Sequence, residues 1–203
     1  MNNTVKNMLL GVLIAMAIVA GWLLAGNTLL QRSDPQYAMR LPEPVALPEF
    51  QLQDSNGNTL TSASLRGRWT LLFFGFTHCP DICPATLQQL ALARRQLADD
   101  GEPLPDILLI SVDPERDTPA LLRSYTEHFG EGVDGATGSL EELRKLTGGL
   151  GIYFEREESD NENYSVAHSP QVIVVNDQGL YAGLFGAPHS VDRFTSDLPI
   201  LMR

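Results

Sequence analysis

The sequence predicts an α/β protein with a mixed central sheet, and three observations lead to that prediction. Short apolar runs at 70–76, 107–112 and 172–175 are typical of buried strands. Amphipathic segments at 84–98 and 119–129 follow the first two of these runs, which indicates alternation of strands and helices. The chain then closes with a predicted hairpin and a last helix, so the sheet cannot be wholly parallel.

The other predicted elements follow from local signals. Turn residues indicate a hairpin over 50–60, and Asp117 or Thr118 can cap the helix that Pro119 begins. The acidic, polar run at 155–163 predicts a mobile excursion. The remaining predicted elements are a helical turn at 62–65, a strand at 133–136, a helix from Ser139 to about Gly149, a strand at 152–154, a hairpin strand at 180–185 and a helix at 191–201.

The N-terminal part is predicted to be a membrane anchor with a linker. Residues 8–25 carry no charge and are long enough to cross a bilayer. This run exceeds the roughly 7–15 apolar residues of a cleaved signal peptide, so we expect an uncleaved anchor. The expected organisation is a tail at 1–7, a transmembrane helix at 8–26, a linker at 27–47 and a globular domain at 48–203. Pro35, Pro42 and Pro44, with Pro48 just after them, are expected to keep the linker extended and without regular structure.

Charge excludes one class of partner. The chain has a formal net charge of −11, and all 25 acidic residues follow the predicted anchor. Such a domain is repelled by phosphate backbones, so no nucleic acid is expected as a partner. A partner with a basic face, or a cation, fits this charge better.

Both cysteines, Cys79 and Cys83, lie between a predicted strand and a predicted helix. A helix N-terminus carries partial positive charge, which favours a thiolate. Two sulfurs four positions apart can point the same way within one turn. Such a pair can form a disulfide or bind one soft metal ion, Cu(I) or Zn²⁺. The spacing alone does not choose between these roles, and inert buried cysteines remain an alternative.

Three motifs closely resemble the Sco/SenC/PrrC family of copper proteins. They are Gly-Phe-Thr-His-Cys-Pro-Asp-Ile-Cys-Pro at 75–84, Ser-Val-Asp-Pro-Glu-Arg-Asp-Thr-Pro at 111–119 and Val-Ala-His-Ser-Pro at 166–170. The likeness covers residues 48–201, and the membrane anchor resembles the family too. The resemblance implies a thioredoxin-like sandwich. It also implies a protein that delivers copper to the binuclear copper centre of cytochrome c oxidase, reduces thiols on that route, or both.

The resemblance also implies the site residues. Cys79 and Cys83 would be two copper ligands and the redox pair, His168 would be the third metal ligand, and Asp113 would lie near the metal. Two thiolates and one imidazole suit Cu(I) or Cu(II). The alternative for Asp113 is a turn-forming role. One departure is Ala167, where the family more often has an acidic residue.

Other residues of interest have simpler predicted roles. His78 is expected to point away from its neighbour Cys79, because adjacent residues of an extended segment diverge. His128 ends a predicted helix and His189 begins one, and neither needs to be a ligand. Pro170 follows His168 closely, and the resemblance to thioredoxin-like proteins suggests a cis peptide bond between Ser169 and Pro170.

Three functions therefore stay open. A metallochaperone would pass copper to the copper-site subunit of cytochrome c oxidase, whereas a thiol–disulfide oxidoreductase would keep the cysteines of that site reduced. A peroxidase is disfavoured, because Phe76 stands where a threonine would be needed, three residues before Cys79. A copper donor or thiol reductant in the periplasm would be a further partner. The expected location is the inner membrane, with the soluble domain in the periplasm.

Overall fold

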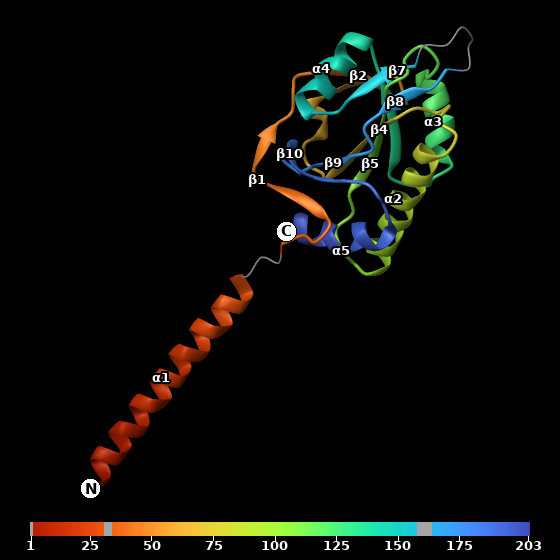
Figure 1. Cartoon of the computed structure of the whole chain (residues 1–203). Coiled ribbons are helices and arrows are strands. Elements are labelled where there is room, and N and C mark those ends of the chain that lie inside the picture. The colour runs from red at the N-terminus through yellow and green to blue at the C-terminus, as the bar shows by residue number, and fades with distance from the viewer. Residues whose placement is uncertain (1, 31–33, 158–163) are drawn as a thin grey trace. The chain divides into compact units, whose positions relative to one another are not determined.

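The computed structural model describes residues 2–30, 34–157 and 164–203 (Figure 1). The chain forms two compact units, Met1–Asp34 and Pro35–Arg203. The first unit contains helix α1, which covers 28 residues from Asn3 to Leu30. Among the described residues, none of the helices combines the length and the hydropathy that a bilayer span requires. Part of the predicted excursion, at 158–163, lies outside the described residues.

The second unit is a mixed α/β domain. Its helices are α2 (Ile82–Asp99), α3 (Pro119–Glu127), α4 (Leu140–Leu150) and α5 (Val191–Leu201), with a short 3-10 helix at Ser62–Leu65. Its strands are β1 (Ala38–Ala46), β2 (Gln51–Asp54), β3 (Thr59–Thr61), β4 (Thr70–Gly75), β5 (Asp106–Ser111), β6 (Val133–Thr137), β7 (Phe154–Arg156), β8 (Val166–His168), β9 (Val172–Val175) and β10 (Leu180–Phe185).

Eight of the strands form one sheet in the order β1-β10-β9-β4-β5-β6-β2-β3. The pairs β4–β5 and β5–β6 are parallel, and the other neighbours are antiparallel, so the predicted mixed sheet is confirmed. All six residues of β4 are buried, as are the last five of β5. Strands that are covered on both faces explain the continuous apolar runs seen in the sequence. Within the part of the chain that the structure describes, strands β7 and β8 pair only with each other (Figure 1).

Strand β1 corrects the prediction for the linker. We expected no regular structure before residue 48, but β1 is an edge strand that pairs with β10 and shifts register between Arg40 and Val45. Its prolines, Pro42 and Pro44, lie within the shifted part, and an edge strand or a bulge tolerates the missing N–H. The carboxylate of Asp197 in α5 accepts a hydrogen bond from the N–H of Ala38 at 2.7 Å, which ties β1 to the domain.

The helix ends largely follow the predicted signals. Thr118, not Asp117, caps α3, with Pro119 in its first turn. Ser139 caps α4 by accepting a hydrogen bond from the N–H of Glu142. This helix continues to Leu150 and ends where Gly151 takes a left-handed conformation with φ of 68°.

The predicted cis bond between Ser169 and Pro170 was wrong. In the described residues, the cis peptide bond is between Ala187 and Pro188, in the turn before α5. Any X–Pro bond has a small trans preference, so the sequence did not distinguish one proline from the other.

Candidate metal centre

The two thiols are held where β4 meets α2. The N–H of Cys79 donates to the carbonyl of Phe76, which closes the loop after β4. Cys83 lies in the first turn of α2 and is 0% exposed, whereas Cys79 is half-buried. The N–H of Cys83 points at the sulfur of Cys79, with 3.4 Å between the two atoms. Both cysteines are free thiols in this structure.

Gly75 makes room for the buried sulfur. A Cβ atom at this position would lie 2.9 Å from the Sγ of Cys83 and 3.3 Å from a methyl group of Leu109. The lack of a side chain at the end of β4 therefore lets the sulfur pack directly against the strand.

His168 reaches the thiols from a different part of the chain. It is the last residue of β8, and its Nε2 lies 3.4 Å from the Sγ of Cys83. Its ring stands edge-on to Phe73 and Phe76, and its Nδ1 lies 3.1 Å from the carbonyl oxygen of Ser169. One ligand atom each from Cys79, Cys83 and His168 lies within 4.8 Å of the others. The three predicted ligands are thus brought together across 85 positions of sequence.

Burial controls the protonation of this cluster. It raises the pKa of the Cys83 thiol, and a hydrogen bond with Cys79 adds to the effect. The prediction that the helix N-terminus would favour a thiolate was therefore wrong for Cys83, because burial removes the hydration that a thiolate needs. Burial also lowers the pKa of His168, which keeps its imidazole neutral. A cation that bound here would have to displace the proton of Cys83.

Asp113 and Asp117 form a second, adjacent cluster with His78. The carboxylate of Asp113 is 3% exposed and accepts hydrogen bonds from Arg116 at 2.5 Å and from Tyr164 at 2.6 Å. The structure thus places Asp113 beside Asp117 and His78 and bonded to other side chains, and its predicted role near a metal stays a prediction. Sequence reasoning missed Tyr164 entirely.

Asp117 fixes the thiol loop to the end of β5. Its buried carboxylate accepts hydrogen bonds from the backbone N–H and the hydroxyl of Thr77 at 2.9 and 2.5 Å. It also accepts one from the hydroxyl of Ser111 at 2.5 Å. The predicted capping role for Asp117 was wrong, because these three donors occupy it instead.

The other histidines lie apart from the thiols, as expected. The side chain of His78 is 48% exposed and lies against Thr77 and Asp117. His128 follows α3 at its C-terminal end. His189 stacks on Phe194 and hydrogen-bonds the carbonyl of Pro170 at 2.6 Å, and burial lowers its pKa. None of them belongs to the group of two sulfurs and one imidazole.

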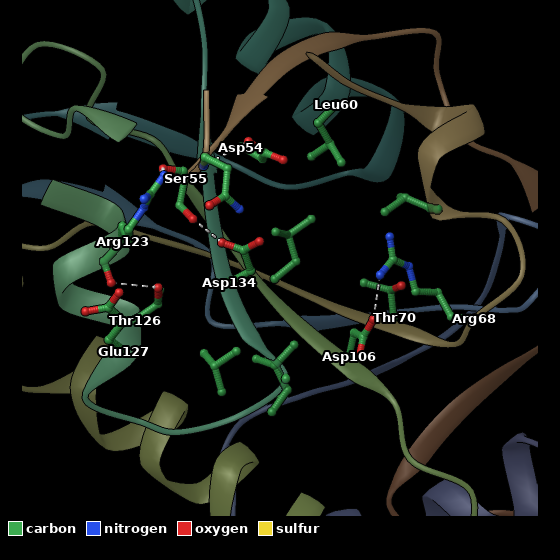
Figure 2. Close-up of a pocket in the computed structure, with 16 residues that line it drawn as sticks. Asp54, Ser55, Leu60, Arg68, Thr70, Asp106, Arg123, Thr126, Glu127 and Asp134 are labelled. Carbon is green, nitrogen blue, oxygen red and sulfur yellow. Dashed lines mark hydrogen bonds and ion pairs between the residues drawn. The ribbon is translucent and has the colours of Figure 1, made fainter. Parts of the chain in front are cut away.

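A cavity of about 510 Å³ lies at the N-terminal ends of the parallel strands β4 and β5, whereas the thiols lie beyond their C-terminal ends (Figure 2). Thr70 and Asp106, the first residues of β4 and β5, line it, whereas the thiol loop follows the last residue of β4. Asp106 pairs with Arg68 at 3.0 Å, and the hydroxyl of Ser55 donates to Asp134 at 2.5 Å. Its described lining has neither cysteine nor histidine, so it offers no soft ligand.

Comparison with known proteins decides the family. A family model described as SCO1/SenC matches residues 40–203. The chain belongs to the SCO1/SenC family. Its mixed sheet and helices form the thioredoxin-like Sco fold, as the sequence predicted.

Sco relatives come from distant organisms. A relative from Stutzerimonas stutzeri is 36% identical over 176 residues, which cover 87% of this chain and 85% of the relative. The mitochondrial SCO2 homolog of Bos taurus is 37% identical over 152 residues, and the match spans 74% of this chain and 57% of that relative's length. The crystal structure of Arabidopsis thaliana ScoI with copper bound has a TM-score of 0.73 and 33% identity, over 77% of this chain and 98% of that one.

Proposed function

We propose that this Sco protein is a copper metallochaperone that holds copper between Cys79, Cys83 and His168. The observation that carries the proposal is the convergence of two sulfurs and one imidazole nitrogen within 4.8 Å. Thiolates select soft ions such as Cu(I), and imidazole suits copper in either oxidation state. The related Arabidopsis thaliana ScoI has been solved with copper bound, which supports copper as the ion.

The surroundings of the three side chains suit reversible binding. His168 is kept neutral by burial, so its Nε2 is free to donate a lone pair when its proton is on Nδ1, facing the carbonyl of Ser169. Cys83 is protonated without metal and must lose its proton on binding, so proton and metal compete. Copper is the cargo in this proposal, and a partner that offers its own thiolates would take it by ligand exchange.

The family resemblance suggests the recipient. We propose that copper goes to the copper-site subunit of cytochrome c oxidase. The supplier would be a copper donor in the periplasm. The acidic domain would favour a recipient with a basic face around its copper site.

The membrane anchor remains a prediction from the uncharged run at 8–25. In the proposed arrangement it holds the protein in the inner membrane with its domain in the periplasm. Fractionation of cells that express the full chain tests this, with a variant that lacks residues 1–34 as the control. We expect the full chain to stay in the membrane pellet after a high-salt wash and the truncated one to be released. Release of both would contradict an anchor.

Copper titration tests the central proposal. We expect the reduced protein to bind one Cu(I) tightly in competition with a chromophoric chelator, and the Cu(II) form to show a thiolate-to-copper absorption band. His168→Ala should weaken binding and change that band, because a ligand has been removed. A wild-type protein without a tight one-to-one copper site would refute the proposal.

A thiol–disulfide oxidoreductase is the second candidate, favoured by the half-exposed Cys79 beside the buried Cys83. The thiolate of Cys79 would attack a substrate disulfide and release one substrate thiolate. Cys83, after losing its proton, would then attack the mixed disulfide, so that the Cys79–Cys83 disulfide forms and the second substrate thiol leaves. A thiol reductant must then restore the pair. This activity should survive His168→Ala, whereas copper binding should weaken and its absorption band should change, which separates the two functions.

A further inference from the structure

His168 stands on a hairpin that lies outside the main sheet. Among the described residues, strands β7 and β8 pair only with each other, with Phe154 opposite His168 and Arg156 opposite Val166. Two backbone hydrogen bonds extend the pairing, from Ser169 to the carbonyl of Tyr153 and from Glu157 to that of Ser165, both at 2.9 Å. All of these bonds lie within the hairpin, so its position relative to the thiols depends on the short connection to β9 and on side-chain contacts, including those of His168 with Phe73 and Phe76.

Tyr164, two residues before β8, joins the hairpin to the turn after β5 by polar and cation–π contacts. It is 8% exposed, and its hydroxyl donates to the Oδ1 of Asp113 at 2.6 Å. The guanidinium carbons of Arg116 and Arg156 lie 3.6 and 3.7 Å from the centre of its ring. A desolvated aromatic ring against a guanidinium is a favourable cation–π contact. Tyr164 is thus packed between a cation from its own hairpin and one from the turn after β5.

The turn after β5 also contacts the hairpin through charged side chains. Arg116 donates from Nε to the Oδ2 of Asp113 at 2.5 Å, so both carboxylate oxygens of Asp113 are used. Arg156 of β7 pairs with Glu115 at 2.7 Å. Residues 113–116 begin two positions after the last residue of β5, a strand of the central sheet, and Asp117 next to them fixes the thiol loop. This group forms a continuous connection from the rigid sheet to the hairpin that carries His168.

We propose that Tyr164 is the positioning residue for His168. Its hydroxyl bonds Asp113, and its ring packs between Arg116 and Arg156. These contacts, which we call the latch, hold the β7–β8 hairpin so that the imidazole stays beside Cys83. The proposal deepens the proposed copper site and rests on it. Tyr164 itself touches no ligand in the described structure. It acts through strand β8, four residues and about 13 Å along an extended chain from His168.

The expected size of the effect follows from other metal sites. Removal of a side chain that orients a metal ligand commonly costs 10–100-fold in affinity. Tyr164→Phe deletes only the hydroxyl and keeps the ring between the two guanidinium groups. It leaves a buried carboxylate with one hydrogen bond fewer, which is unfavourable. We expect copper affinity to fall by roughly tenfold and the copper absorption band to move toward that of His168→Ala.

The matched control is Tyr153→Phe on the same hairpin. The side chain of Tyr153 is exposed, and its hydroxyl donates to the equally exposed Glu155 at 2.5 Å. The same chemical change there removes no contact with the 113–116 turn. We expect wild-type copper affinity, and wild-type disulfide reduction in both tyrosine variants, because neither change touches the thiol pair.

Amide hydrogen exchange of the metal-free, full-length protein separates the latch from the copper proposal. We expect faster exchange in Tyr164→Phe at Glu157 and Ser169, the amides that hold the hairpin together, and no change at Leu109 within β5. Faster exchange at these two amides supports the latch even if the wild-type protein binds no copper. Wild-type exchange and a wild-type absorption band in Tyr164→Phe would overturn the latch and leave the copper site intact.

Arg156→Met is a second variant for the same test, and it can be used if Tyr164→Phe does not fold. It removes one side of the ring's packing and the exposed ion pair with Glu115, while Asp113 keeps both of its donors. We expect a smaller change in the same direction, both in exchange at Glu157 and Ser169 and in copper affinity. A variant that is indistinguishable from wild type in both measurements would overturn the proposal.

Discussion

The two sides of the candidate metal centre are built in different ways. The thiol side belongs to the core, because β4 is buried along its length and Cys83 packs into the first turn of α2. The imidazole side is a three-residue strand in a separate two-stranded sheet. Side-chain contacts through Tyr164 join that small sheet to the turn after β5. A sulfur pair built into the main sheet and α2 thus faces a histidine on a strand outside that sheet, placed by side-chain packing.

Because of this difference, substitutions on the two sides should affect folding stability and metal binding to different extents. Changes on the thiol side should affect the fold as well as the ligands, because the same atoms are part of the hydrophobic core. Changes on the hairpin should alter the third ligand with little effect on the core. The following experiments test that contrast, beginning with the largest expected effect.

Cys83→Ser should nearly abolish copper binding. Serine keeps the shape but replaces a soft sulfur with a hard oxygen, and removal of a ligand should exceed the 10–100-fold loss seen when only a ligand's support is removed. Competition titration with Cu(I) measures this, with Tyr153→Phe as the control. Retention of affinity within tenfold of wild type would show that Cys83 is not a ligand.

Gly75→Ala should destabilise the fold from the thiol side. The added methyl group would lie 2.9 Å from the sulfur of Cys83 and 3.2 Å from the ring of Phe73. Overpacking of this kind typically lowers the free energy of unfolding by about 1–3 kcal/mol. Urea denaturation of the metal-free protein measures it.

The matched control for this substitution is Gly148→Ala. Gly148 lies within α4 with open space around it, and alanine there should stabilise the helix by up to about 1 kcal/mol. Equal stability of Gly75→Ala and the wild type would contradict the close packing of sulfur against β4.

The two thiols should differ in reactivity. Cys79 is half-buried, whereas Cys83 is fully buried and has a raised pKa. Because the thiolate is the reactive form, iodoacetamide should modify Cys79 at least about tenfold faster in the reduced protein. Mass spectrometry of peptides after timed quenching measures both rates. Equal rates would mean that the first turn of α2 opens readily.

Stability should depend on pH in opposite directions at the two ends of the range. The pKa of His168 is lowered from 6.5, so the unfolded chain binds more protons below that value and the free energy of unfolding falls as the solution becomes acidic. The pKa of Cys83 is raised from 9.0, so stability is lost as pH rises through that value. Thermal unfolding between pH 5 and 10 measures both.

Substitutions identify the groups responsible for the loss of stability at acidic and at alkaline pH. Cys83→Ser should flatten part of the alkaline fall, to which the half-buried Tyr125 also contributes because burial raises its pKa, and His168→Ala should flatten part of the acidic one. His189 also has a pKa that burial lowers, so it should account for a further part of the acidic fall. An alkaline fall that is identical in Cys83→Ser would mean that another group is responsible.

Much of the domain could be predicted from local sequence patterns. The buried strands β4, β5 and β9 appear as apolar runs, and the start of α3 follows from Pro119 after a threonine. The thiol pair could be found because four-residue spacing at a helix start is itself a local pattern. The partnership of the thiols with His168 came from the family resemblance, because no local pattern links residues 85 positions apart.

The features that could not be predicted depend on tertiary contacts. The prolines of β1 indicate a linker by themselves, and only the pairing with β10 makes this segment a strand. The pKa of Cys83 depends on how deeply the sulfur is buried, which the spacing of the cysteines does not specify. Likewise, the partners of Asp113 include Tyr164, 51 positions away in the sequence.

The prolines of β1 have a consequence for self-association. Sheet edges with free N–H groups are templates on which a second chain can add a strand. Here one edge is β1, where Pro42 and Pro44 remove two donors, and the other is β3, which has three residues. Neither border offers a long, regular row of donors and acceptors. The domain is therefore protected against strand-to-strand aggregation even when many copies are crowded together.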